Sequence, residues 1–250
     1  MSTTDHDAIR HDAAGHAAQP AEDILLPAEE QARADLYALV ATLLFRAPDA
    51  PILAALAGAP PLASTAGDNP LDDGWRALVD AARSADPAAV SEEFDALFVS
   101  IGTPPLNPYA SHYLTGFMME RPLAALREDL AQLGLARAAG VGEPEDHLAA
   151  LCEAMRAMIA GLPGHRGGLP LARQRRFFRD HIAPWYGRCL DDIRDAQAAA
   201  FYRHAAVFAR AFLDIEFQAF EIEDAFDLAL PREEAPKMQP DAFLPPGATP

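Results

Sequence analysis

The sequence predicts an all-α fold: a single globular domain of about ten helices. Apolar residues recur at the three- to four-residue spacing of a helix along most of the chain, and no segment alternates convincingly as a strand does. Half of the 250 residues are hydrophobic, which suffices for a sizeable core, and alanine, the strongest helix former, is abundant. We expect the domain to span residues 28–230, flanked by a disordered polar tail over 1–27 and a disordered proline-rich tail over 231–250.

The N-terminal half shows a series of amphipathic stretches. In chain order the expected helices are residues 29–45, a short one over 52–56, a stretch around 75–82, and one opened by Pro87 whose inward face carries Phe94 and Phe98. Loops separate them where proline and glycine gather. The segment Gly102–Tyr109 holds too many prolines for a helix or a central strand.

The C-terminal half continues the helical pattern. In chain order we expect a helix from Pro122 to about 138, one beginning within 142–148 and ending at Gly161, one over 171–189 interrupted at Pro184, and a long one over about 196–228. A glycine-rich link over 161–170 separates the second of these helices from the third.

The helix start at 142–148 reads Gly-Glu-Pro-Glu-Asp-His-Leu. Proline suits the first helical position, and acids in the first turn complement the helix dipole, so start chemistry accounts for Glu143, Pro144 and Glu145. Start chemistry does not account for His147 beside Asp146. This adjacent ionisable pair is therefore the strongest candidate functional feature of the segment.

Composition excludes several classes of partner. A formal net charge of −17 argues against nucleic acid and anionic membranes and suits a basic partner, such as an arginine-bearing peptide. Solubility is the alternative explanation of this acidity. The N-terminus lacks the features of a secretory signal, and no apolar run approaches a membrane span, so we expect a cytoplasmic protein.

The sequence contains no motif for a nucleotide, a catalytic nucleophile or a metal. Cys152 and Cys189 have no zinc-ligand or redox spacing, so we expect neither a disulfide nor a metal or other cofactor. A metal site from Glu143, His147 and Cys152 is disfavoured because Cys152 lies off the face that the other two share. The arginines near Phe177 form a solvated rim rather than a nucleic-acid site.

Three motifs in order resemble the TorD/DmsD family of redox-enzyme chaperones. The first runs from Glu93-Phe94 to an element Pro108-Tyr109-x-Ser111-x-Tyr113, and the second is the E-P-x-D-H pattern of residues 143–147. The third is Gln174, Phe177, His181 and Trp185 at helical spacing, in which His181 and Trp185 pin the late helices together. The resemblance covers about residues 30–228.

The resemblance implies a TorD-like helical fold and a chaperone that is not an enzyme. Members bind the twin-arginine signal peptide and the body of a molybdoenzyme, hold it until the molybdenum cofactor is inserted, and occur as monomers or domain-swapped dimers. Three alternatives remain: a chaperone for a non-exported client such as a nitrate reductase or formate dehydrogenase, a general helical scaffold, and an enzyme that uses Asp146 and His147 as an acid–base pair.

The expected peptide-binding residues combine the motifs with nearby aromatic side chains: Asp146, His147, Glu143, Pro144, Tyr109, Ser111, Tyr113 and Trp75. We expect Asp146 and His147 at an exposed helix start on the rim of a peptide groove. There Asp146 pairs with a peptide arginine, while His147 hydrogen-bonds the peptide backbone and changes charge near neutral pH. Packing roles for Tyr109 and Tyr113, and a core role for Trp75, are the alternatives.

Overall fold

The computed structural model describes residues 26–62, 69–99, 104–137, 142–162 and 167–229. Nearly all of both predicted tails lie outside these ranges. Within them the chain forms α1 (Ala28–Phe45), α2 (Ala50–Ala57), α3 (Pro70–Ser84), α4 (Pro87–Phe94), α5 (Ala110–Thr115), α6 (Arg121–Gln132), α7 (Leu148–Ala160), α8 (Leu171–His181), α9 (Tyr186–Asp195) and α10 (Phe201–Ala229). The described residues contain no β-strand, so the predicted all-α class is confirmed.

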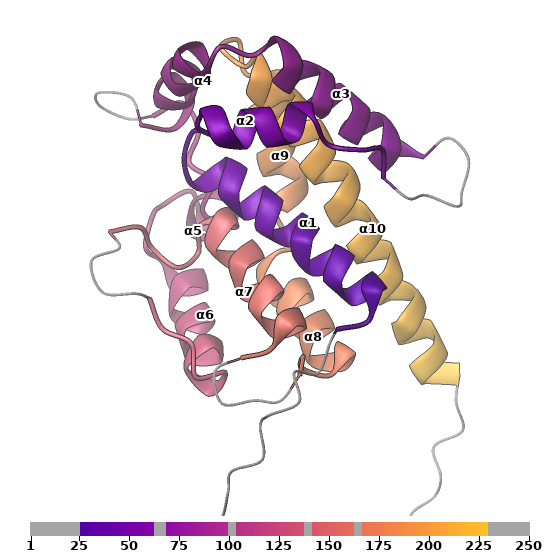
Figure 1. Cartoon of the computed structure of the whole chain (residues 1–250). Helices are drawn as coiled ribbons and strands as arrows, with labels where there is room; N and C mark the ends of the chain where they lie inside the picture. Colours follow the sequence, from indigo (N-terminus) through magenta and orange to yellow (C-terminus); the bar gives the residue numbers. More distant parts are fainter. Residues whose placement is uncertain (1–25, 63–68, 100–103, 138–141, 163–166, 230–250) are drawn as a thin grey trace, which may run out of the picture.

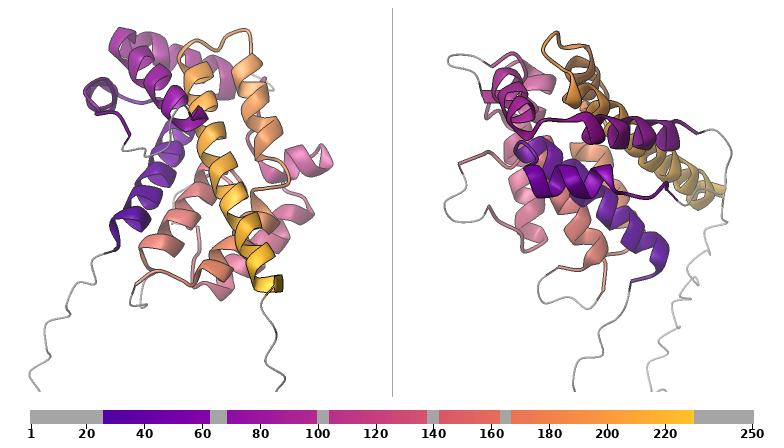
Figure 2. Two further views of the ribbon diagram at one scale, coloured as in Figure 1. Left: turned by 90° about the vertical axis from the view of Figure 1, so that its right-hand side faces the viewer. Right: turned by 45° about the horizontal axis from the view of Figure 1, so that its top comes forward.

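One helix pair and one long helix organise the molecule. Helices α1 and α7 lie side by side, and α10 runs along the flank of the domain, where it packs against α3 and α9 (Figure 1). The second set of views shows α9 and α10 next to each other along most of α9 (Figure 2). Helices α3 and α4 lie at one end of the molecule and α6 and α8 at the other (Figure 1).

Local sequence signals explain three of the N-terminal helix starts. Asp49, Asn69 and Asp86 each accept a hydrogen bond from a backbone N–H of the first turn of α2, α3 and α4, and a proline follows within two residues in each case. The predicted boundaries of α2 and the predicted start of α4 are close to those observed, whereas α3 begins at Pro70, ahead of the predicted stretch around 75–82. After Phe94 the backbone of α4 widens into a π-helical turn over Asp95–Val99.

The main difference from the predicted elements lies before Pro122. The short helix α5 was not predicted, because its proline-rich approach indicated only a loop. The predicted interruption at Pro184 is confirmed, because α8 ends at His181 and α9 begins at Tyr186. Phe177 and Phe178 are buried, whereas Phe94 and Phe98, expected in the core, are only partly buried against it.

A buried ion pair joins α1 to α10. Arg33 donates from Nε and Nη2 to the two carboxylate oxygens of Glu216, at 2.9 and 2.7 Å, and Tyr37 donates its hydroxyl to Glu216 at 3.0 Å. Arg33 also reaches Gln174 of α8 at 3.3 Å. Glu216 is only 4% exposed, so this bidentate contact takes the place of its hydration.

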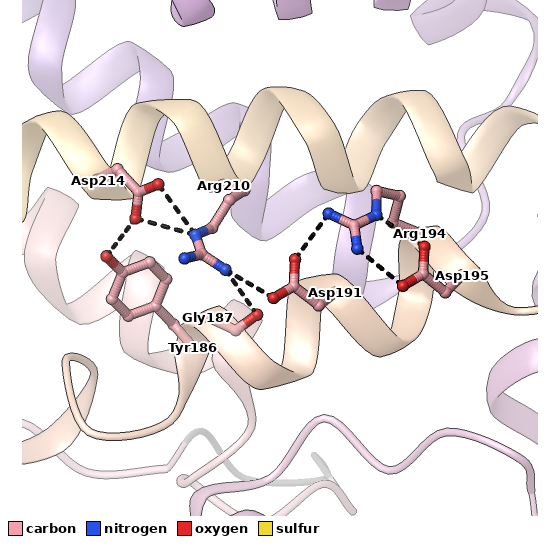
Figure 3. Close-up of polar contacts among 7 residues, drawn as sticks. All are labelled: Tyr186, Gly187, Asp191, Arg194, Asp195, Arg210 and Asp214. Atoms are coloured by element: carbon pink, nitrogen blue, oxygen red, sulfur yellow. Dashed lines mark hydrogen bonds and ion pairs between the residues drawn. The ribbon is translucent and has the colours of Figure 1, made fainter.

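A second polar network fixes α9 against α10 (Figure 3). Arg210 donates to Asp214 on its own helix and to Asp191 and the carbonyl of Gly187 on α9, at distances of 2.9–3.0 Å. Tyr186 donates to Asp214 at 2.6 Å. A Cβ at position 187 would lie 3.0 Å from the Arg210 guanidinium, so glycine allows this close approach.

No helix in the described part of the chain is long and apolar enough to cross a membrane. The same residues contain no group of His, Cys, Asp and Glu side chains arranged to hold a metal ion.

Candidate functional site

Two of the three sequence motifs meet in one backbone junction. Tyr109 and His147 form an isolated antiparallel bridge. Beside it, the N–H of Ala110 donates to the carbonyl of Asp146 and the N–H of Leu148 donates to the carbonyl of Pro108, both at 2.9 Å. The element before α5 and the element before α7 therefore hold each other in place.

Asp146 lies inside this junction and not on a rim. Its side chain is 0% exposed, and its Oδ2 accepts a hydrogen bond from the backbone N–H of Ser111 at 2.9 Å. The predicted exposure of Asp146 is wrong because its carboxylate caps the first turn of α5 rather than the helix that follows it in sequence. Oδ1 is buried and has no partner among the described residues.

His147 is the N-cap of α7. Its Nδ1 accepts a hydrogen bond from the N–H of Ala149 at 3.0 Å, and the side chain is 7% exposed, so its predicted exposure is wrong too. Burial lowers the pKa of His147 to about 4, although Glu143 and Asp146 act in the opposite direction. The imidazole is therefore neutral near neutral pH, contrary to the predicted charge change, and carries its proton on Nε2.

The acids before His147 form a turn and not the first helical turn. Helix α7 begins at Leu148, and the N–H of His147 donates to the carbonyl of Pro144 at 3.3 Å. The prediction that Pro144 opens the helix is therefore wrong. Glu143 accepts a hydrogen bond from the hydroxyl of Tyr109, whose ring stands edge-on to His147 with centroids 4.9 Å apart.

An apolar groove of about 640 Å³ opens beside this turn. It lies between α7, the C-terminal end of α6 and the turn, with the half-exposed Phe45 of α1 at its edge. The apolar lining comprises Phe45, Leu130, Leu135, Ala136, Pro144, Ala150, Leu151, Ala154, Ala157 and Leu162. The charged residues of the lining are Glu143, Glu145 and Glu153 together with Arg137 and Arg156, so acidic side chains outnumber basic ones by one.

The groove brings together only part of the predicted site. Glu143, Pro144 and His147 line the groove. Asp146, Tyr109 and Ser111 do not line it; their hydrogen bonds hold the turn and the junction in place. In the described structure His147 Nε2 has no hydrogen-bond partner, so it is a neutral donor on a groove-lining side chain.

Tyr113 and Trp75 serve other parts of the fold. Tyr113 is buried, stacks on Trp185 with centroids 5.5 Å apart, and donates to Asp192 of α9 at 3.0 Å. Trp75 packs against Phe208 and lines a separate pocket of about 330 Å³. Packing, the alternative considered for Tyr113, accounts for all of these contacts.

The third motif links α8 to α6 and α5. His181 of α8 contacts the carboxylate of Asp129 on α6 at 2.8 Å, and the indole of Trp185 donates to the carbonyl of His181 at 2.7 Å. The prediction that these two residues pin the late helices together is only partly met: Trp185 bonds the end of α8, but the side chain of His181 reaches α6 and the indole of Trp185 stacks on Tyr113 of α5.

Glu145 is the groove residue that the sequence did not single out. Its Oε2 accepts hydrogen bonds from Nη2 and Nε of Arg127 at 2.8 and 3.1 Å. Burial is the largest single effect and raises the pKa of Glu145, but the hydrogen bond from Arg127, a backbone hydrogen bond and the charges of Arg127 and Arg137 together outweigh it, so the pKa is lowered. The sequence did contain a signal for Glu145. This residue occupies the variable position of the E-P-x-D-H motif, so the motif itself does not explain why the side chain is acidic.

Comparison with known proteins agrees with the motifs. A family model described as the nitrate reductase delta subunit matches residues 65–191, about half of the chain. The Chaperone protein TorD of two Vibrio cholerae serotype O1 strains is 30% identical over 129 residues, which cover 50% of this chain and 59% of the relative. The chain thus spans about 59% of the length of these curated relatives.

A solved structure, a putative redox enzyme maturation protein from Archaeoglobus fulgidus, is 22% identical with a TM-score of 0.47, covering 74% of this chain and 93% of the other. The family match is decisive, because it includes the whole junction and the groove turn. The chain belongs to the nitrate reductase delta subunit family, to which its TorD/DmsD-like motifs pointed.

Proposed function

We propose that this chain is a maturation chaperone for a redox enzyme and not itself an enzyme. Its client is a molybdoenzyme, whose twin-arginine signal peptide enters the groove beside α7 while the molybdenum cofactor is inserted. The observation that carries the proposal is an apolar groove of about 640 Å³ lined by the carboxylates of Glu143, Glu145 and Glu153, in a chain of this family.

The chemistry of the groove suits both halves of such a peptide. Phe45, Leu135 and Ala136 offer exposed or partly exposed apolar surface to the hydrophobic segment of a signal peptide, whose burial supplies most of the binding free energy. The carboxylates suit the arginines that precede that segment. A groove of this volume holds several peptide side chains rather than a whole helix.

His147 adds a contact to the peptide backbone. With Nδ1 occupied by Ala149, the protonated Nε2 donates to a peptide carbonyl without introducing a charge. Asp146 contributes indirectly, since it fixes the junction that places His147 and the turn. The complete burial of Asp146 also counts against an acid–base enzyme, because a substrate has no access to its carboxylate.

Net charge supports the choice of partner. A chain with a formal charge of −17 attracts a cationic peptide over a distance, and salt weakens such attraction.

The description of the family model favours a nitrate reductase catalytic subunit as a second candidate client, which need not be exported. A client of that kind would present its apoprotein surface without a twin-arginine segment.

Calorimetric titration of the purified protein with a panel of signal peptides tests the proposal. We expect micromolar or tighter binding of a peptide with two consecutive arginines before an apolar segment, and weaker binding as salt increases. A panel that includes the client's own peptide and gives no binding contradicts the proposal. Binding only to the apoprotein of a nitrate reductase subunit, and to no peptide, supports the second candidate.

A further inference from the structure

In this structure the groove residue Glu145 pairs with the guanidinium of Arg127. Glu145 lines the groove with a side chain 14% exposed, and Arg127 of α6 approaches it from outside with a side chain 51% exposed. Both nitrogens of the contact reach the same oxygen, Oε2. The other oxygen, Oε1, has the Nε of Arg137 at 4.0 Å, beyond hydrogen-bond distance.

We propose that Glu145 is the carboxylate that binds an arginine of the client peptide, and that Arg127 is an internal stand-in which this arginine displaces. The inference rests on the proposed function, since a peptide must first enter the groove. Arg127 already shows that a guanidinium and this carboxylate meet with good geometry. Arg127 therefore competes with the peptide arginine for the carboxylate of Glu145.

The energy of the exchange is favourable to the peptide. An ion pair with a half-exposed arginine contributes about 0–1 kcal/mol, so releasing Arg127 costs little. A peptide held by its apolar segment presents its arginine to Glu145 at high local concentration. Because Glu145 is largely buried, water and salt screen the new contact less than they would at an open surface.

The other carboxylates at the groove are less suited to this role. Glu143 already accepts the hydroxyl of Tyr109, and Glu153 pairs with Arg156 on its own helix, with a side chain 53% exposed. Asp146 is enclosed in the junction. Glu145 combines partial burial, a place in the lining and an exchangeable partner.

A cycle of two peptides and two variants tests the proposal by calorimetry. One peptide carries two arginines before an apolar segment, and the other carries two glutamines in their place. We expect Arg127→Gln to bind the arginine peptide roughly three- to fivefold more tightly and the glutamine peptide unchanged. Glu145→Gln should bind the arginine peptide about tenfold more weakly and the glutamine peptide unchanged.

Arg76→Gln is the matched control, because Arg76 forms an exposed pair with Asp73 on α3, outside the groove. An unchanged or lower affinity of Arg127→Gln for the arginine peptide contradicts the stand-in role. Equal weakening of both peptides by Glu145→Gln shows that Glu145 acts on the fold and overturns the proposal. If Glu145→Gln is unfolded by circular dichroism, the exposed Arg127 variant decides alone.

The outcomes also separate this inference from the proposed function. A wild-type protein that binds both peptides equally retains a peptide-binding groove but has no arginine site, so only the inference fails. A wild-type protein that binds neither peptide contradicts the proposed function and the inference together.

Discussion

The carboxylate of Asp146 accepts a hydrogen bond from the backbone N–H of Ser111, and in doing so it caps a helix that precedes it by more than thirty residues in the chain. Ser111 returns the support, because its Oγ accepts the N–H of Glu120 where the chain turns into α6. Asp146 of the E-P-x-D-H motif and Ser111 of the preceding motif therefore act together to fix the same part of the fold.

Loss of this cap should lower stability and leave binding by the folded protein intact. We expect Asp146→Ala to destabilise the protein by about 1–2 kcal/mol, and Asp146→Asn to cost less because the amide oxygen still accepts a hydrogen bond. For a domain of this size 1 kcal/mol corresponds to about 2–4 °C in melting temperature. Thermal melts and peptide titrations on both variants provide the measurement.

Asp86→Ala, which removes the exposed cap of α4, is the comparison for an ordinary cap. A tenfold loss of peptide affinity in Asp146→Asn at an unchanged melting temperature would show that the carboxylate contacts the peptide after all, which the buried position argues against.

Glu93 caps α10 from a distance, and its removal should be costly. Its two oxygens accept the N–H groups of Ala200, Phe201 and Tyr202 at 2.8–2.9 Å, which would otherwise be unpaired in the first turn. We expect Glu93→Ala to lower the free energy of unfolding by about 2 kcal/mol or more. Urea unfolding measures the change, and the exposed neighbour Glu92→Ala should stay within about 0.5 kcal/mol of wild type. Equal effects of the two substitutions would refute the capping role.

These two caps show what the sequence could and could not predict. The starts of α2, α3 and α4 were predictable because acid or amide, proline and helix are adjacent in sequence. The start of α7 carries the same local signals, but Asp146 serves α5 instead, so the helix begins later than predicted. The N-terminus of α10 takes its cap from Glu93 on α4, which no local pattern reveals.

The groove was unpredictable for a related reason. Its lining combines Phe45 of α1, Leu130 of α6 and Leu151 of α7, which the sequence presents as three separate apolar faces. The sequence did identify Glu143, Pro144 and His147, since their motif is contiguous. It gave no reason to prefer Glu145 to Asp146, because which of two adjacent acids is buried depends on the partner that α5 supplies.

His147 should make stability depend on pH in acid solution. Its pKa is about 4 in the folded protein and 6.5 in a model peptide, so between these values the unfolded chain binds more protons. Stability from this group is complete above pH 6.5 and falls as the pH is lowered towards 4, by up to about 1.4 kcal/mol per pH unit. Urea unfolding across this window measures the effect.

His147→Asn isolates the contribution, because asparagine caps a helix without titrating. The difference in unfolding free energy between wild type and this variant should change with pH in that window and be constant above it. A difference independent of pH would mean that the imidazole titrates normally in the folded state.

The contact between Arg33 and Glu216 should show strong energetic coupling between the two residues. Glu216→Gln leaves the guanidinium of Arg33 without its bidentate partner, and we expect a loss of about 3–5 kcal/mol. Replacing both residues, as Arg33→Met with Glu216→Leu, should recover part of that loss because the buried charge is removed, although the buried hydroxyl of Tyr37 then loses its acceptor. A double-mutant cycle from urea unfolding measures the coupling, and additive losses would contradict a shared contact.

The most direct measurement of the central claim is the affinity of a twin-arginine peptide for a protein whose groove has been filled. Ala157 lines the groove on α7 and is only partly buried, so Ala157→Trp occupies the space with little cost to the core. The matched variant Ala54→Trp carries the same side chain on the exposed face of α2, outside the groove. If the peptide binds beside α7, Ala157→Trp loses at least about tenfold in affinity at an unchanged melting temperature while Ala54→Trp equals wild type. Equal affinities in all three proteins would contradict the account.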